Sequence, residues 1–366
     1  MHRDPRVRRQ LFALRDEFQV TAAGLTDPEI EEVQFVKIGA VAQKRFVPKW
    51  INIHINIWAR RFRFYNYPFW KSGKFYDYIK LCWKRYDFII ANDELTLPLV
   101  FMLPGRHKIM VDMHEYFPDY YAYRKDQCGF LQEEITQRCL KYLPKADVVT
   151  TVCEGLAQRY KNEICHRDIH VIKNVAPFYD LDPALIKNKV RIIYHGSDAP
   201  IRNVHTHILA MDEADDRYYL DLMLVHAGDM DYRDKLEEMA KVRENVTIIP
   251  PVSTEEIIPF THAYDIGLFL LKPMNTNYEF ALPNKLFEFI QARLAVIIGP
   301  SVEMAKIVNK YQCGRVAENF NSTTCAALLN SLTNEDIFQM KKQSSVAAVQ
   351  ENFEQERGKL LSLIKS

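Results

Sequence analysis

The sequence predicts an α/β protein made of two doubly wound domains. Its 366 residues are enough for two separate hydrophobic cores. Short apolar runs of strand length alternate with helical patterns along most of the chain, which is typical of parallel sheets covered by helices on both faces. The alternation is interrupted at residues 175–190, where two prolines and several polar residues predict a linker.

The N-terminal domain is predicted over residues 1–174. It begins with a helical pattern at residues 6–17 and contains a second one at residues 133–143. Strands are predicted at residues 18–22, 88–91, 108–112, 147–152 and 170–174. A doubly wound domain normally opens with its central strand. Because a helix begins here at Pro5, we expect that the first strand lies upstream of this chain's start or is absent.

The C-terminal domain is predicted over residues 191–345, and a mixed helical stretch follows at residues 346–366. Strands of this domain are predicted at residues 191–196, 221–225, 245–249, 265–269 and 294–299. The last of them is apolar throughout, as in a parallel strand that is buried on both faces. The same α/β pattern therefore occurs on both sides of the linker.

The most informative stretch, residues 282–290, lies shortly before that last strand. Pro283 suits the first position of a helix, because the amide hydrogen that it lacks would have no partner there. Lys285 and Glu288 then share one helix face. A helix N-terminus with a cation can hold a phosphate, and the carboxylate can accept hydrogen bonds from ribose hydroxyls. The alternative is a surface ion pair on an amphipathic helix that packs through Leu286, Phe289 and Ile290.

Composition excludes several classes of protein. No window contains the roughly 20 uncharged apolar residues of a membrane-spanning helix. The N-terminus is charged from residue 2 onward, which is not the pattern of a signal peptide. Seven scattered cysteines lack the spacing of a zinc site and indicate reduced thiols. We therefore expect a cytoplasmic protein.

The charge of the chain is unevenly distributed. Residues 43–85 contain eleven basic residues and one acidic residue, so this segment carries +10 and the rest of the chain −9. Thirteen aromatic residues accompany the basic ones. This mixture favours in-plane attachment to an anionic membrane. The predicted contacts with the membrane or the acceptor are Trp58, Arg60, Arg61, Arg63 and Trp70.

Two other interpretations of residues 43–85 remain open. Single-stranded nucleic acid also binds basic and aromatic side chains. The sequence contains no signature of an RNA-binding fold, however, so no nucleic-acid partner is expected. Alternatively, the aromatic residues form the core of a helical subdomain whose basic face is solvated.

Five stretches are characteristic in their order and spacing: residues 4–7, 112–117, 145–154, 194–202 and, most specifically, 281–298. Together they resemble the GT-B glycosyltransferases, and most closely the large family-4-like group of retaining enzymes that use nucleotide sugars. The resemblance covers nearly the whole chain. It implies two Rossmann-like domains facing across a cleft, with the acceptor on the N-terminal domain and the donor on the C-terminal domain.

The resemblance also implies roles for single residues. Lys285 and Arg202 would hold the donor diphosphate, where two fixed cations stabilise the charge that develops on the leaving group. His114, the third predicted catalytic residue, would lie near the donor sugar. Glu288 would bind the ribose, and the other donor-binding candidates are Gly196, Gly228, Pro251, Val252, Glu279, Leu282 and Asn284.

Each of these roles has an alternative. Without the resemblance, Arg202 would be an exposed loop arginine and His114 a structural histidine. In an inverting mechanism His114 or Glu115 would be the general base, whereas the resemblance implies retention.

The chain departs from the group at two positions. Phe280 stands where many members have a second glutamate, with Glu279 beside it, and Ser197-Asp198 stands where a basic residue often follows the glycine. The triplet Asp229-Met230-Asp231 looks like a metal-binding motif. It follows a strand and precedes a helix expected from Asp234, so it more plausibly starts that helix. We therefore expect no metal and no other cofactor.

The sequence thus predicts a hexosyltransferase-type glycosyltransferase that is peripheral on the cytoplasmic face of a membrane. Its donor would be a UDP-, GDP- or dTDP-linked sugar. Its acceptor would be a saccharide or a lipid-linked saccharide in the synthesis of a surface polysaccharide or glycolipid. The alternatives are a nucleotide-sugar epimerase of similar fold and a non-catalytic subunit for binding or assembly.

Overall fold

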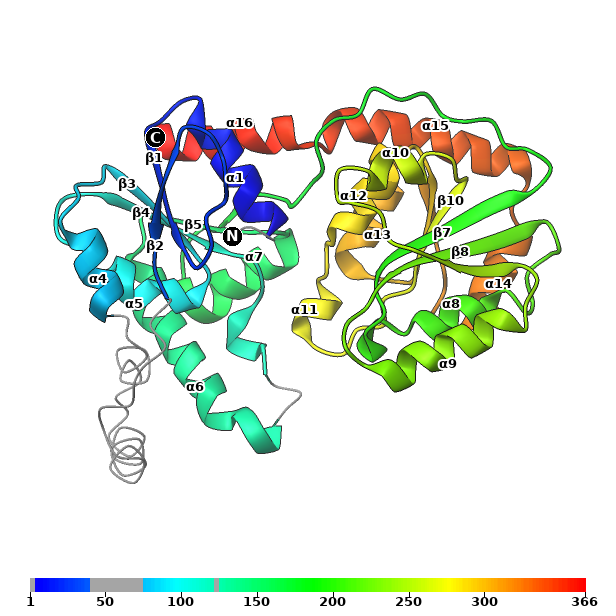
Figure 1. Ribbon diagram of the computed structural model, residues 1–366, viewed down its shortest axis with the longest axis horizontal. Helices are drawn as coiled ribbons and strands as arrows, with labels where there is room; N and C mark the ends of the chain where they lie inside the picture. Colours follow the sequence, from blue (N-terminus) through cyan, green and yellow to red (C-terminus); the bar gives the residue numbers. More distant parts are fainter. Residues whose placement is uncertain (1–3, 40–74, 122–124) are drawn as a thin grey trace. The chain divides into compact units, whose positions relative to one another are not determined.

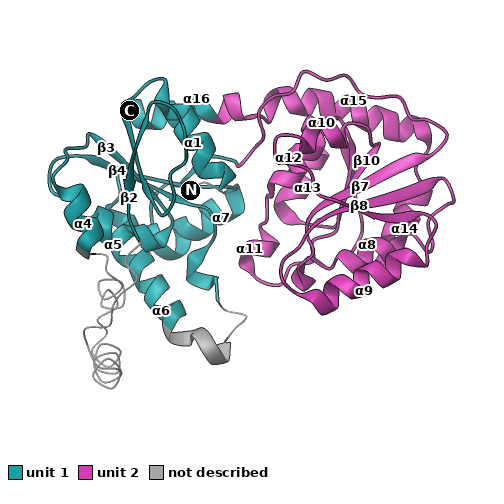
Figure 2. Cartoon of the chain, viewed as in Figure 1, with its two compact units in different colours: residues 1–173, 357–366 teal, residues 174–356 magenta. Residues whose placement is uncertain are grey.

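The computed structural model describes residues 4–39, 75–121 and 125–366, with residues 75 and 125–130 described by their backbone alone. The predicted membrane contacts Trp58, Arg60, Arg61, Arg63 and Trp70 lie outside the described residues. Contacts between residues divide the chain into two compact units (Figure 2). Unit 1 comprises residues 1–173 and 357–366, and unit 2 comprises residues 174–356. Each unit is built on parallel strands (Figure 1).

Unit 1 begins with helix α1 (Pro5–Arg15). Asp4 caps this helix, because its carboxylate accepts hydrogen bonds from the amides of Arg6 and Val7. Strands β1 (Val20–Gly24) and β2 (Val33–Lys37) follow and pair in parallel as a separate two-stranded sheet. The strand predicted at residues 18–22 begins two residues later, and β2 was not predicted. The helix packs on this sheet through a cluster of Val7, Leu11, Ala22 and Ile30.

The second sheet of unit 1 has the parallel order β3-β4-β5-β6. Its strands are β3 (Phe88–Asn92), β4 (Lys108–Met113), β5 (Val148–Thr151) and β6 (His170–Val171). Strand β4 is buried after its first residue and forms the centre of the core. Asn92, Asp112 and Thr150 are register partners across three neighbouring strands, close to the carboxyl ends. Three polar residues therefore meet at one edge of this sheet.

Helices and short turns connect these strands. They are α4 (Phe75–Cys82), η2 (Glu94–Thr96), α5 (Leu97–Val100), η3 (Phe117–Asp119), α6 (Lys125–Tyr142), η5 (Leu143–Lys145), α7 (Glu154–Tyr160) and the π-helical turn η6 (Lys161–Cys165). The end of helix α16 (Phe353–Lys365) also belongs to unit 1. Arg357 Nε donates to the carbonyl of Ala13 at 3.2 Å, and Lys365 pairs with Glu17 at 2.9 Å.

Unit 2 contains a six-stranded parallel sheet in the order β12-β11-β10-β7-β8-β9. Its strands are β7 (Val190–Ser197), β8 (Tyr218–Val225), β9 (Val246–Ile249), β10 (Ile266–Phe269), β11 (Ala295–Ile298) and β12 (Gly314–Val316). The chain builds outward from β7 through β9, and then in the other direction from β10 through β12. The topological switch point therefore lies between β7 and β10, where ligands of doubly wound domains bind.

Helices cover both faces of this sheet (Figure 1). One group consists of α8 (Val204–Ala210), α9 (Met230–Lys241) and α14 (Ser322–Asn330). The other consists of α10 (Ile257–Thr261), α12 (Asn284–Gln291), α13 (Val302–Tyr311) and α15 (Asn334–Gln350). Two shorter elements follow the switch-point strands, η7 (Pro200–Arg202) after β7 and α11 (Thr276–Glu279) after β10.

The predicted linker forms neither helix nor strand over residues 175–189. Arg293 holds it against unit 2 by donating to the carbonyls of Tyr179 at 2.5 Å and Leu181 at 3.0 Å. The predicted segment 346–366 comprises the end of α15 and all of α16. The exact domain boundaries given by the sequence stay predictions.

Candidate functional site

The first cluster of predicted residues lies at the switch point of unit 2. Gly196, near the end of β7, has φ +136°, which favours glycine. A Cβ atom added to Gly196 would lie 2.2 Å from Cε and 2.5 Å from Nζ of Lys285. The same Nζ is 5.5 Å from the ring centroid of Phe269, which ends β10. Lys285 therefore lies against the carboxyl ends of both switch-point strands, and only glycine at position 196 leaves room for it.

Helix α12 carries Lys285 in its first turn. Pro283 is the N-cap with extended backbone (φ −77°, ψ 156°), so the prediction that it is the first helical residue was wrong by one position. An N-cap keeps non-helical dihedrals, and proline accepts them. Glu288 is only 8% exposed, so the alternative of a surface ion pair is wrong too. The predicted packing of Leu286, Phe289 and Ile290 is confirmed, since all three are buried.

The electrostatics at the switch point favour an anion. Burial and the nearby Arg202 guanidinium lower the pKa of Lys285 to about 8. Arg202 ends η7 and lies over the ring of Tyr278, 5.3 Å from its centroid. Within the described ranges, neither cation forms an ion pair with a carboxylate. A partly desolvated ammonium group beside a guanidinium, neither of them paired with a described carboxylate, is an arrangement that a diphosphate would complete.

His195 was not predicted as a site residue, although it lies between Tyr194 and Gly196 in one of the characteristic stretches. It is buried, and its Nε2 is 3.5 Å from a carboxylate oxygen of Glu288, too long for a hydrogen bond. Burial and then the Lys285 charge lower the pKa of His195 to about 3. The imidazole is therefore neutral at pH 7 and adds no charge to the site.

The remaining donor-binding candidates follow other strands of the same sheet. Gly228, after β8, is exposed and has φ +95°. Pro251 and Val252 follow β9, and Glu279 is exposed at the end of α11. Leu282 is buried and Asn284 is the first residue of α12. Because all the strands are parallel, the loops after β7, β8, β9 and β10 leave the same edge of the sheet.

Asp198 joins two of these loops. Its buried carboxylate accepts from the amide of Ala227 at 2.7 Å and lies 3.1 Å from Nδ1 of His226 and 3.5 Å from Arg233. The sequence singled out Ser197-Asp198 as a departure, because a cation is common there. In the structure Asp198 is a structural link between the loops after β7 and β8, and it does not contact Lys285 or Arg202 through a hydrogen bond or ion pair.

The Asp229-Met230-Asp231 triplet starts helix α9, as predicted, and Asp229 is its N-cap. The Asp229 carboxylate accepts from the amide of Tyr232 at 3.0 Å. The helix begins at Met230, four residues before the expected Asp234. Over the described parts of the chain, no group of three or more His, Cys, Asp or Glu side chains is placed to hold a metal ion.

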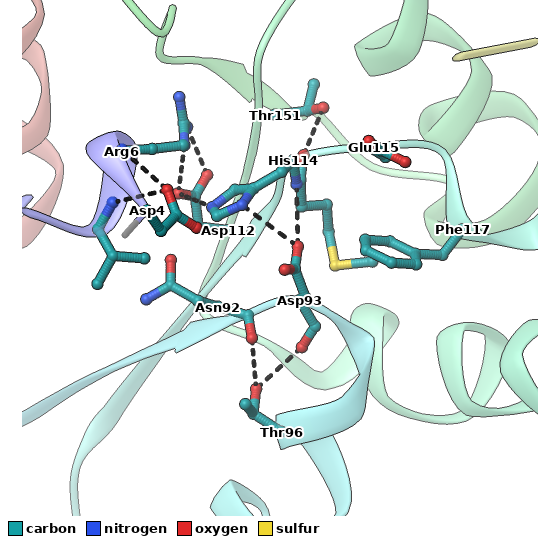
Figure 3. A network of polar contacts seen from close by, with 12 residues as sticks. Asp4, Arg6, Asn92, Asp93, Thr96, Asp112, His114, Glu115, Phe117 and Thr151 are labelled. Atoms are coloured by element: carbon teal, nitrogen blue, oxygen red, sulfur yellow. Dashed lines mark hydrogen bonds and ion pairs between the residues drawn. The ribbon is translucent and has the colours of Figure 1, made fainter. Parts of the chain in front are cut away.

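A second cluster lies in unit 1 at the carboxyl end of β4 (Figure 3). Asp112 is fully buried, and its carboxylate accepts from Nε and Nη2 of Arg6 at 2.8 and 2.6 Å and from the hydroxyl of Thr150 at 2.7 Å. Gln10 donates to the same carboxylate. Arg6 also donates to the carbonyl of Ile172 at 2.7 Å. The first helix is therefore fixed to β4 and to the end of β6 by one buried guanidinium.

His114 extends this network toward Asp93 (Figure 3). Its Nε2 is 3.2 Å from Asp112, its Nδ1 is 3.6 Å from Asp93, and its amide donates to Asp93 at 3.4 Å. Burial alone would lower the pKa of His114, but the two carboxylates outweigh it and raise that pKa. Asp93 has φ +61°, and burial raises its pKa to about 6. The two carboxylates therefore favour the charged form of the His114 imidazole.

Tyr160 fixes the loop that follows His114. Its hydroxyl donates to the carbonyl of Glu115 at 2.7 Å and accepts from the amide of Phe117 at 3.1 Å. Tyr160 ends α7, directly before the π-helical turn η6, and π-helical turns frequently occur near functional sites.

Several of these residues were missed from the sequence. Arg6, Asp93, Asp112 and Tyr160 were not predicted as site residues, although Asp112 ends one predicted apolar strand and Asp93 follows another by two residues. That position was the available signal, because side chains at the carboxyl ends of neighbouring parallel strands converge.

Comparison with known proteins bears on the fold and on unit 2. Residues 180–349 match the family model for glycosyl transferases group 1. No curated protein sequence matches the chain. Among solved structures, one described as "Trehalose-6-phosphate from E. coli bound with UDP-2-fluoro glucose" has a TM-score of 0.68 at 12% identity. The similarity covers 99% of this chain and 96% of that one.

Two further structures are similar over nearly their whole length. A UDP-forming alpha,alpha-trehalose-phosphate synthase from Burkholderia vietnamiensis has a TM-score of 0.66 at 9% identity, covering 97% of this chain and 96% of that one. Another, from Burkholderia xenovorans in complex with glucose-6-phosphate, has a TM-score of 0.65 at 10% identity, covering 100% of this chain and 97% of that one. The predicted GT-B fold class is thereby confirmed.

Proposed function

We propose that this chain, a glycosyltransferase of GT-B fold with a group 1 domain at residues 180–349, moves a sugar from a nucleotide-sugar donor to a saccharide acceptor. The observation that carries the proposal is the place of Lys285 at the switch point of unit 2. Its ammonium group lies against Gly196 and Phe269, beside Arg202, with no ion pair to a described carboxylate. A donor diphosphate supplies the missing negative charge.

The two cations account for the chemistry of the leaving group. Transfer breaks the bond between the sugar and the diphosphate, and negative charge develops on the oxygen that leaves. Lys285 and Arg202 stabilise that charge more in the transition state than in the ground state, because they are held in place before the reaction. Glu288 is proposed to accept hydrogen bonds from the ribose, and the loops at Gly228 and Pro251-Val252 to line the nucleotide.

His114 and Asp93 are proposed to bind a sugar substrate on unit 1. A charged imidazolium donates to sugar hydroxyls or to phosphate oxygens, and an ionised Asp93 accepts from a hydroxyl. The pair suits binding and orientation, which is what a retaining mechanism requires of protein side chains. Retention remains part of the proposal.

UDP is the first nucleoside diphosphate to test. The E. coli structure contains UDP-2-fluoro glucose, and the Burkholderia synthases are described as UDP-forming. GDP and dTDP donors are the other two candidates. The acceptor is proposed to be a saccharide, free or lipid-linked, used in building a surface polysaccharide or glycolipid.

A membrane location is the last part of the proposal. The +10 charge and the aromatic content of residues 43–85 motivate attachment to an anionic membrane surface on its cytoplasmic side. Among the described helices, none is long and apolar enough to span a bilayer. A lipid-linked acceptor would be reached from such a surface.

Thermal denaturation with nucleoside diphosphates tests the donor site. UDP at a hundredfold excess over its dissociation constant should stabilise the protein by about 2.7 kcal/mol. Lys285→Met should remove most of this stabilisation, because methionine keeps the volume and loses the charge. Lys235→Met, on an exposed position of α9, is the matched control and should keep it.

The outcomes separate the alternatives. If UDP, GDP and dTDP all leave the denaturation temperature unchanged, the proposed donor site is wrong. Conversion of a nucleotide sugar without any acceptor would identify an epimerase. If Lys285→Met abolishes nucleotide binding but leaves cellular function intact, the chain is a non-catalytic subunit.

A further inference from the structure

Helix α4 has an exposed apolar outer side at the margin of unit 1 (Figure 1). Tyr76 is 58% exposed, Ile79 is 40% exposed, and Trp83, directly after the helix, is 85% exposed. These three positions recur at helical spacing and so lie on one side of the helix. Three neighbouring cations are also exposed, and we call the six residues the α4 surface: Tyr76, Ile79, Lys80, Trp83, Lys84 and Arg85.

The opposite side of α4 is fixed to the core of unit 1. Leu81 is buried in a cluster with Leu99 and Leu103, against which Tyr78 and Cys82 also pack. The buried helix side therefore sets the rotation of α4 about its axis. The outward direction of Ile79 and Trp83 follows from this packing.

Two lysines of the α4 surface are also held in place. Lys80 Nζ donates to the carbonyl of Lys37 at 2.7 Å, and Lys84 Nζ donates to the side chain of Gln34 at 3.3 Å. Both partners belong to β2. These bonds hold the two ammonium groups next to β2 and leave both lysines exposed.

The only acidic residue between positions 43 and 85 does not reach the α4 surface. Asp77 is 1% exposed and accepts from the amide of Gly39 at 2.8 Å. Its negative charge is therefore directed inward, while Lys80, Lys84 and Arg85 are exposed. The six residues of the α4 surface thus combine large apolar side chains with three cations, and the nearest exposed carboxylate along the chain is Asp87, two residues after Arg85.

We propose that the α4 surface is a membrane-docking surface that lies on the head groups of an anionic bilayer. Tryptophan and tyrosine favour the boundary between head groups and acyl chains. Lysine and arginine attract anionic head groups. A helix that presents apolar and basic side chains together on its exposed side lies in the plane of the membrane. Ile79 and Trp83 would then be inserted, and the three cations would lie among the lipid phosphates.

A bilayer fits the α4 surface better than nucleic acid does. Proteins that bind single strands present aromatic rings as stacking platforms along a basic groove. Here the side chain between Tyr76 and Trp83 is the aliphatic Ile79, which inserts into acyl chains and offers no stacking face. The inference rests on the proposed function in one respect only: the α4 surface would give the enzyme access to a lipid-linked acceptor.

Co-sedimentation of the full chain with vesicles tests the inference. Vesicles of phosphatidylcholine mixed with phosphatidylglycerol should bind the protein at low ionic strength, and vesicles of phosphatidylcholine alone should bind it far less. Replacing Lys80, Lys84 and Arg85 by glutamine should weaken binding roughly fivefold per charge, which is on the order of a hundredfold in all. Ile79→Ser with Trp83→Ser should weaken it about tenfold or more.

Matched controls come from exposed residues of unit 2. Lys187, Lys235 and Lys241, replaced together by glutamine, change the net charge by the same amount. Leu185→Ser with Val242→Ser removes two side chains that are 74% and 78% exposed. Both controls should bind the anionic vesicles like the unmodified protein.

Two results would overturn the inference. One is equal vesicle binding by the α4 variants and the controls. The other is binding of a single-stranded polynucleotide, weakened by the α4 variants, in a protein that ignores anionic vesicles. Stabilisation by UDP, measured on the same samples, reports the donor site separately. Loss of vesicle binding with intact stabilisation therefore distinguishes a failure of this inference from a failure of the proposed function.

Discussion

Lys285 illustrates how one half-buried cation can point to a binding site, here the proposed donor site. Its pKa of about 8 means that the free protein holds an ammonium group which is already partly destabilised by burial and by Arg202. A diphosphate reverses both effects, since it replaces lost hydration and balances the charge. Two observations point to the site: the lowered pKa of Lys285, and its contact with Gly196, where a side chain would displace the ammonium group.

This lysine gives the donor affinity a pH dependence. Lys285 is cationic below about pH 8 and loses its proton above that value, so nucleotide binding should be full below pH 8 and weaken as the pH rises. The decline should approach about tenfold per pH unit well above the pKa of the free protein, because only the cation binds phosphate. Titration calorimetry with UDP between pH 7 and 9.5 measures it. Lys285→Arg keeps its charge over this range and should bind with little pH dependence.

Asp93 allows a different residue-level test, in unit 1. Its pKa of about 6 predicts that transfer activity falls as the pH drops through 6, since the carboxylate is then protonated. Asp93→Asn should lower kcat about 10- to 100-fold, the range of one charge-assisted hydrogen bond, and should remove this acid limb of the pH profile. Asparagine tolerates the positive φ of this position.

The readout for Asp93→Asn has to exclude a general loss of structure. The dissociation constant of UDP should be unchanged, because Lys285 and Arg202 belong to the other unit. An unchanged pH profile in Asp93→Asn would show that the carboxylate takes no part in transfer.

At the scale of elements, the loop after β4 depends on a helix that follows it by more than thirty residues. Tyr160 ends α7 and bonds to both Glu115 and Phe117, so α7 and the turn η6 position the backbone next to His114. Tyr160→Phe removes both hydrogen bonds and keeps the ring. We expect a loss of roughly 1–3 kcal/mol of local stability, a higher KM for the acceptor, and an unchanged dissociation constant for UDP.

Tyr311→Phe is the matched control for this element. Its buried hydroxyl donates to Glu351 at 2.8 Å in unit 2, so its loss should reduce stability by a similar amount. It should leave the acceptor KM unchanged. Equal effects of the two variants on the acceptor KM would contradict a positioning role for Tyr160.

At the scale of the molecule, the limit of prediction from sequence follows from the distance between partners along the chain. Helix α12 could be placed to within one residue because its cap and apolar spacing are local. The network around Asp112 could not be predicted, because it joins this residue of β4 to residues 6 and 10 of α1, to residue 114 in the following loop and to residue 150 of β5. The separate β1-β2 sheet was missed for the same reason, since no local pattern specifies which strands pair.

The division into two units predicts how the whole chain unfolds. No sheet is shared between the two units and each has its own core, so calorimetry of the full chain should show two transitions. Arg6→Met leaves the Asp112 carboxylate buried without its main partner, which costs about 3–5 kcal/mol. It should lower only the transition of unit 1. UDP, which is proposed to bind at the switch point of unit 2, should raise only the other transition.

Acid adds an independent check on the same assignment. Arg6 and His114 hold the pKa of Asp112 well below its usual range, against the effect of burial. A depressed pKa contributes stability that is present above the unfolded-state value of about 4 and is lost as the pH falls below it. In the unmodified protein, the transition that loses stability from the Asp112 network below pH 4 should therefore be the same one that Arg6→Met lowers. In the Arg6→Met variant this loss below pH 4 should be smaller. If UDP and Arg6→Met instead shift one common transition, the two units unfold together and the separate assignment is wrong.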